Sequence, residues 1–262
     1  MPTSVFTKTV RDQVRSLVGW SVGTAATVVI MAAIWPSFSD MDIDGLLDQY
    51  PEALREVFNI TSMSTGSGYL NAELFSLMLP AIFIVFAVGR GARLIAGEEE
   101  DGTLELLVTL PVTRTAILLQ KAAGLVVELV VLSVVLFVAV WGSSALFGLD
   151  VGVVPALNGS LSMGLLGLEF GWIALALSAA TGRRTVAVGV SSALAGAAYL
   201  AYLAAQLIES LRPLRNASPF HQAISGGPIG DRLPPVVWLT VAAGLVVLAG
   251  SIRVFSVRDL RL

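Results

Sequence analysis

The sequence has no cysteine and only one histidine, His221. Without cysteine, the chain has no disulfide, no thiolate nucleophile and no thiolate ligand for an iron–sulfur cluster. One histidine outside any Ser-His-acid arrangement argues against a metal cluster and against a hydrolase triad. Charged residues are also scarce, at 13% of 262 residues against about 25% in a soluble domain. We therefore expect no catalytic site, no metal site and no bound cofactor on this chain.

What the sequence does contain is apolar residues in long runs. Hydrophobic residues make up 55% of the chain, and the mean hydropathy is +0.82. A helix needs about 20 apolar residues to cross a bilayer. Six runs are long enough, at approximately residues 17–39, 70–95, 118–148, 154–181, 185–209 and 233–254. We predict an all-α integral membrane protein, with six transmembrane helices in one domain that covers residues 1–262 and with the lipid bilayer as its surroundings.

The distribution of Lys and Arg predicts the orientation, because cytoplasmic loops of membrane proteins are enriched in both. With a cytoplasmic N-terminus, the basic residues on the cytoplasmic side are Lys8, Arg11, Arg15, Arg90, Arg93, Arg114, Lys121, Arg183, Arg184, Arg253, Arg258 and Arg261. The other side then holds only Arg55, Arg212, Arg215 and Arg232. We predict a multi-pass cell-membrane protein with both termini in the cytoplasm. The basic residues are too dispersed to form a nucleic-acid surface.

The residues before the first run form an amphipathic pattern. Phe6, Val10, Val14 and Leu17 recur every three or four positions, and charged residues occupy the other face. This polar start and the length of the run that follows argue against a signal peptide. We expect an N-terminal interfacial helix that lies along the inner membrane surface.

An acidic run follows the second predicted span, inside the one long loop expected on the cytoplasmic side, residues 89–121. The four acids of this run, residues 98–101, are too concentrated in charge to be buried. Gly102 then permits a tight turn. Because inner leaflets carry a negative potential, we expect the acidic run to meet a basic protein partner.

A short amphipathic helix is predicted after Gly102. Thr103 is placed to cap it, and Glu105 in its first turn would interact favourably with the helix dipole. Its apolar stripe consists of Leu104, Leu107 and Leu110. Pro111 ends this helix, and Thr113 can cap the third span. From the pattern alone, the short helix could equally lie on the membrane surface or contact a partner.

The string GEEEDGTLELLVTLPVTR, from Gly97 to Arg114, resembles the coupling-helix loop of type-2 ABC exporter permeases. That loop has the pattern E-x-x-x-G-T-L-E-x-L-L-x-x-P-V-x-R. The matching residues are Glu98, Gly102, Thr103, Leu104, Glu105, Leu107, Pro111, Val112 and Arg114. Weaker similarities at Gly19–Trp20, Ser218–His221 and Arg258–Leu260 extend the resemblance over the whole chain.

The resemblance implies a membrane-spanning permease subunit of an ATP-driven exporter. Two permease halves, a homodimer or a pair of homologues, would form the substrate path and meet along the first and fifth spans. Two copies of an ABC-type ATPase subunit, with ATP and Mg²⁺, would move the coupling helices formed by residues 98–114. The chain has no G-x-x-x-x-G-K-[ST] loop, so nucleotide chemistry is expected on the partner and this chain is not an enzyme.

Two carboxylates interrupt the apolar spans. Glu128 lies two turns beyond Lys121 and is expected to pair toward the cytoplasmic end, whereas Glu169 lies deeper. A charged group at the bilayer centre costs about 2.5 to 3.5 kcal/mol on insertion scales, so both should face protein or water. Glu128 and Glu169 are candidates for a substrate pathway; the alternative is that they are protonated or hydrogen-bonded packing residues.

Other function classes remain open from sequence. A membrane anchor or signalling scaffold could use the same cytoplasmic helix to bind a partner without transport. A secondary transporter is less favoured, because no matching pair of Gly/Pro-interrupted spans occurs in the two halves. An intramembrane enzyme is disfavoured by the absence of a nucleophile–base pair in the spans.

Overall fold

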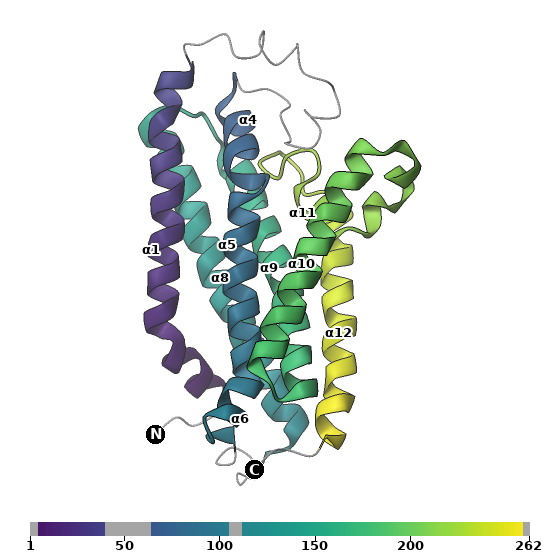
Figure 1. The fold of residues 1–262 in the computed structure, drawn as a ribbon. Helices are drawn as coiled ribbons and strands as arrows, with labels where there is room; N and C mark the ends of the chain where they lie inside the picture. The colour runs from purple at the N-terminus through teal and green to yellow at the C-terminus, as the bar shows by residue number, and fades with distance from the viewer. Residues whose placement is uncertain (1–4, 40–63, 105–111, 259–262) are drawn as a thin grey trace.

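A computed structural model describes residues 5–39, 64–104 and 112–258, and its main feature is a bundle of six long helices (Figure 1). These helices are α1 (Val5–Ser39), α5 (Met78–Ala92), α8 (Arg114–Phe147), α9 (Val153–Thr181), α10 (Arg184–Leu207) and α12 (Val237–Val257). The described residues contain no β-strand, and each of the six helices supplies a segment long and apolar enough to cross a membrane. The predicted all-α membrane protein with six spans is confirmed.

The second span continues beyond α5 and ends in the acidic run. A π-helical turn, η2 (Arg93–Gly97), connects α5 to the short helix α6 (Glu98–Glu100). The whole candidate span runs from Met78 to Glu100. The acids therefore belong to the last helical turn of this segment and do not form a separate loop.

Local capping residues set several helix ends. The Thr113 hydroxyl accepts a hydrogen bond from the amide of Ala116 at 3.2 Å, so the predicted cap of the third span is confirmed. Gly148 ends the same helix with φ +70°, a left-handed conformation that glycine adopts readily. The last span begins at Val237, later than the predicted residue 233, because Pro234 and Pro235 precede the regular helix.

Helix α9 lies at the centre of the bundle and packs against α5, α8, α10 and α12. Its approach to α5 is close because small residues face each other. A Cβ atom added to Gly91 would overlap the carbonyl oxygen of Gly171 on α9. Without side chains at the contact, the two backbones can meet directly.

The amphipathic N-terminal segment is not a separate helix, contrary to expectation. It is the first part of α1, which continues without a break from Val5 to Ser39, and Figure 1 shows its first turns bent relative to the rest. Its buried face includes the polar Thr9, which packs against Gly124 of α8. Its position on the membrane surface stays a prediction.

We call the end of the bundle where α1 begins and α12 ends the terminal end; it is at the bottom of Figure 1. The opposite end carries the short elements α4 (Gly66–Leu70), η1 (Asn71–Phe75), η3 (Glu209–Ala217) and α11 (Pro219–Ile224). There the Asn71 side chain bonds to both the amide and the carbonyl of Ile229, at 3.0 and 3.2 Å. This contact ties the segment before α5 to the loop before α12.

Candidate functional site

The acidic run at the terminal end closes with a Schellman motif. The amide of Thr103 donates to the Glu98 carbonyl at 2.9 Å, and the amide of Gly102 donates to the Glu99 carbonyl at 3.2 Å. Gly102 has φ +68°, the left-handed conformation that this motif requires. The predicted tight turn at Gly102 is confirmed.

The acids of this run are largely used within the chain. Lys121 of α8 pairs with Glu98 at 2.6 Å, and the backbone amide of Arg184 donates to Glu100 at 2.9 Å. Glu99 pairs with Arg258, and its side chain is only 4% exposed. The expectation that all four acids are too concentrated to be buried is therefore wrong for Glu99, because three other helix ends bring hydrogen-bond donors to them.

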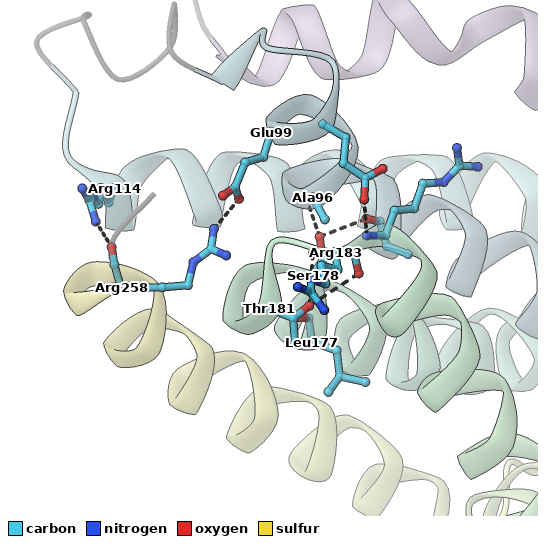
Figure 2. Close-up of polar contacts among 11 residues, drawn as sticks. Ala96, Glu99, Arg114, Leu177, Ser178, Thr181, Arg183 and Arg258 are labelled. Atoms are coloured by element: carbon cyan, nitrogen blue, oxygen red, sulfur yellow. Dashed lines mark hydrogen bonds and ion pairs between the residues drawn. The ribbon is translucent and has the colours of Figure 1, made fainter. Parts of the chain in front are cut away.

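Glu99, Arg114 and Arg258 form what we call the terminal clasp, shown in Figure 2. Arg258, at the end of α12, donates to the Glu99 carboxylate and accepts a hydrogen bond from Arg114 on its own backbone carbonyl, at 2.6 Å. Gly182, with φ +61°, fits against this group, since an added Cβ would overlap the Arg258 guanidinium. The clasp therefore joins α6, the start of α8 and the end of α12 beside the α9–α10 turn.

Ser178 of α9 explains the π-helical turn just before the acids. Its hydroxyl accepts from the Ala96 amide at 2.7 Å and donates to the Ala92 carbonyl at 2.9 Å (Figure 2). These two backbone groups would bond to each other in a regular α-helix. The inserted hydroxyl separates them, which is a known cause of helix distortion. Nothing in the local sequence of residues 92–97 signals this, because Ser178 lies on another helix.

The family of the chain follows from a comparison with protein families. A family described as ABC-2 family transporter protein matches residues 3–260. The chain belongs to the ABC-2 transporter family. A comparison with curated proteins gives no match. The resemblance inferred from the loop is confirmed, and this ABC-2 protein is a multi-pass membrane component of an ABC-type transporter, a class whose ATPase is normally a separate subunit.

The predicted coupling segment of this ABC-2 protein is described only at its two ends. Glu98, Gly102 and Thr103 lie at its start, and Arg114 lies in the clasp at its finish. Leu104 is buried, at 1% exposure, and the Thr103 hydroxyl donates to the Glu98 carbonyl at 3.3 Å. Residues 105–111 lie outside the described residues, and the predicted contact residues among them are Glu105, Leu107 and Pro111. The short helix and its ATPase contact therefore stay predictions.

Glu128 of the ABC-2 protein is held in a buried ion pair. Its carboxylate lies 2.8 Å from Nε of Arg90, and the two side chains are 2% and 9% exposed. Arg90 also donates to the backbone carbonyl of Gln13 at 3.0 Å and lies 5.4 Å from the ring centre of Phe86. Glu128 pairs toward the terminal end, as expected, but with Arg90, since Lys121 is taken by Glu98. This pair ties α1, α5 and α8 together.

Glu169 lies inside the bundle on α9, at 7% exposure, as expected for a carboxylate that avoids lipid. Its Oε2 is buried and has no hydrogen-bond partner among the described residues. Nε1 of Trp172, one turn further along the same helix, is also buried and unpartnered within the described part of the chain. Both residues lie against Gly244 of α12. Buried polar atoms without partners are uncommon, and they single out this α9–α12 contact.

We expect the terminal clasp to stabilise the folded protein through Arg258. Changing Arg258 to Gln removes the cation from the nearly buried Glu99, which should lower the free energy of unfolding by about 1 to 3 kcal/mol. The thermal midpoint of the detergent-solubilised protein measures this. The matched control is Arg253→Gln, an exposed arginine on the same helix. Equal midpoints for the two variants would show that the clasp contributes nothing.

Proposed function

We propose that this ABC-2 protein is the membrane-spanning subunit of an ATP-driven exporter. Two such subunits would form the substrate path, and two copies of a separate ABC-type ATPase would bind and hydrolyse Mg-ATP. The segment of residues 98–114 would receive the force of the ATPase. The direction, export, is what the resemblance of this segment to exporter permeases implies.

The observation that supports the proposal is how firmly the two ends of this segment are held. Its start is fixed by the Schellman motif at Gly102 and by the pairing of Glu98 and Glu99 with α8 and α12. Its finish is fixed by the Thr113 cap and by the bond from Arg114 to α12. A displacement of the residues between these anchors would therefore act on several spans together, as a coupling element must.

A dimer is supported by two unpartnered helix faces. On α10, Gly189, Ser192 and Gly196 form an exposed stripe, and a Cβ added at either glycine would meet nothing. On α1, Val22 and Ala26 are exposed on the side away from the buried face. Small residues at this spacing let helices approach closely in a membrane. The proposed interface therefore joins α1 of one copy to α10 of the other.

The buried carboxylate of Glu169 is a candidate for the substrate path, and one substitution tests it. Glu169→Gln keeps the shape of the side chain and removes its ionisable group. We expect the fold to tolerate the change and ATP-dependent transport by the reconstituted complex to fall. The control is Glu209→Gln, an exposed acid at the opposite end. Unchanged transport by Glu169→Gln would remove this residue from the path.

The proposal as a whole is tested by purifying the tagged protein from its native membrane, identifying what accompanies it and assaying ATPase activity. We expect an ABC-type ATPase, with recovery or activity lowered by Glu105→Arg and unaffected by Glu209→Arg. Recovery of the chain alone, or with a partner that has no ATPase activity, would contradict the proposal. That result would favour a membrane anchor or signalling scaffold.

A further inference from the structure

A polar cavity of about 340 Å³ opens at the terminal end, between the first turns of α1 and the end of the second span. Its lining consists of Thr9, Gln13, Ser16, Arg90, Arg93, Leu94, Glu98, Asp101 and Thr103. The candidate spans Gln13–Ser37 and Met78–Glu100 both have an end here. The cavity is therefore at the depth where the headgroups of one lipid leaflet lie.

Four of the described residues that line the cavity are charged, and two of these four are held in ion pairs. Arg90 is paired with Glu128 and Glu98 is paired with Lys121, as described above. The side chains of Arg93 and Asp101 have no ion pair or hydrogen bond within the described residues, and both residues are exposed. They are eight positions apart in the helix and turn, roughly 12 Å along the axis. Among its described lining residues, the cavity thus offers one unpaired cationic side chain and one unpaired anionic side chain at separate positions.

The side-chain amide oxygen of Gln13 lacks a hydrogen-bond donor among the described residues. Oε1 of Gln13 is buried and has no hydrogen-bond partner among the described residues. Buried side-chain oxygens normally accept a hydrogen bond from protein, water or a ligand. Gln13 lines the same cavity as Arg93, whose aliphatic stem lies against Gly97. An amine in the cavity would supply the missing donor.

A second, mostly apolar groove of about 460 Å³ is a neighbour of the polar cavity. It lies between α1 and α5, and Ser16 lines both spaces. Further along, its walls are Gly19, Trp20, Gly23, Thr24, Thr27 and Ile82. A polar cavity at headgroup depth that adjoins an apolar groove inside the membrane has the shape of one amphiphile, with a headgroup and an acyl chain.

The two free charges decide which headgroup fits. A purely anionic headgroup would leave the Asp101 carboxylate unpaired, and a purely cationic headgroup would leave the Arg93 guanidinium unpaired. A headgroup with a phosphate and a primary ammonium satisfies both ends: the phosphate pairs with the planar guanidinium of Arg93, and the ammonium donates to Asp101 and Gln13. A quaternary ammonium has no N–H to donate.

We propose that this cavity and groove bind a phospholipid whose headgroup carries a phosphate and a primary amine, as in phosphatidylethanolamine. Glu98, Asp101 and Thr103 of the proposed coupling segment line the cavity. Occupation of the site by a lipid nevertheless depends neither on the ATPase nor on transport. It would place a bilayer lipid between the start of α1 and the end of the second span.

Native mass spectrometry of the delipidated protein in detergent tests the proposal. The probes are dioleoyl phosphatidylethanolamine, phosphatidylglycerol and phosphatidylcholine at equal concentration. We expect phosphatidylethanolamine to be retained preferentially, and Arg93→Gln to lower its retention about tenfold, the effect of losing one charge-assisted contact. Asp101→Asn should abolish the preference over phosphatidylglycerol. Arg253→Gln, an exposed arginine on α12, is the control and should change nothing.

The groove is tested separately, with Gly23→Leu, since a side chain at Gly23 meets no atom within 4 Å and would extend into the groove. We expect lower retention of the phospholipid, with Gly250→Leu on α12 as control, where space is also free. Water-soluble phosphoethanolamine should bind far more weakly than the lipid. Equal retention by wild type and Arg93→Gln, or equal retention of phosphatidylglycerol and phosphatidylethanolamine by wild type, would overturn the proposal, as would phosphoethanolamine binding as tightly as the lipid.

Discussion

Changing Arg90 to Met should lower the free energy of unfolding by about 3 to 5 kcal/mol, because it leaves the carboxylate of Glu128 buried without its cation. The side chain of Glu128 is only 2% exposed, so solvent contact is too small to replace the ion pair. The substitution also removes the bond from Arg90 to the backbone of α1. Titration of the protein from a mild detergent into a denaturing one, followed by circular dichroism, measures the loss.

The double variant Arg90→Met with Glu128→Met separates the ion pair from simple packing. Replacement of a whole buried pair by apolar residues of similar volume is often neutral, so we expect it to recover most of the stability. Arg93→Met, one turn further along and exposed, is the control for removal of a cation from this segment. Glu128→Met alone is measured as well. If the losses of Arg90→Met and Glu128→Met simply added in the double variant, the two charges would not be coupled.

Changing Gly91 to Ala should destabilise the protein by about 1 to 3 kcal/mol or more, as overpacking of a filled interior does. The new methyl group would overlap the backbone of α9 at Gly171 and would also lie 3.1 Å from the Ala174 side chain. The clash with a backbone atom cannot be relieved by rotating a side chain, so α5 and α9 must move apart.

Gly89→Ala is the matched control for this prediction. Gly89 lies two residues earlier on the same helix, and a Cβ there would meet no atom within 4 Å. Alanine is the better helix former by up to about 1 kcal/mol, so this variant should be neutral or slightly stabilised. Relative to the unchanged protein, Gly91→Ala should therefore lower the thermal midpoint clearly, and Gly89→Ala should leave it unchanged or raise it slightly. Similar midpoints would show that α5 and α9 do not approach as closely as described.

The six spans were predictable because the requirement is local. Hydrocarbon excludes unpaired backbone groups, so each crossing needs its own uninterrupted apolar helix, and such runs can be counted along the chain. The same locality explains why the Gly102 turn and the Thr113 cap were predicted correctly, since a helix end is decided by a few neighbouring residues. The N-terminal segment was predicted as a separate helix because its pattern changes near Leu17, yet a change of pattern need not interrupt backbone hydrogen bonds.

The polar contacts at the terminal end could not be predicted in the same way. A charge-dense run such as residues 98–101 is normally solvated, and only the meeting of several helix ends supplies donors for Glu98, Glu99 and Glu100. No sequence pattern indicates that the Ser178 hydroxyl bonds to the backbone of Ala92 and Ala96, because Ser178 lies on another helix. Gly89 and Gly91 are equivalent in the sequence, and only the position of α9 distinguishes them.

The sequence by itself thus determined the membrane setting, the number of spans and the transporter family, because each depends on a local pattern or a contiguous motif. The tertiary structure decided which charges neutralise each other. Glu128 pairs with Arg90, 38 residues away in the sequence, and Glu99 pairs with Arg258, 159 residues away. In a low-dielectric interior a buried charge must have a partner, but which partner it meets depends on how the helices pack, and no local pattern encodes that.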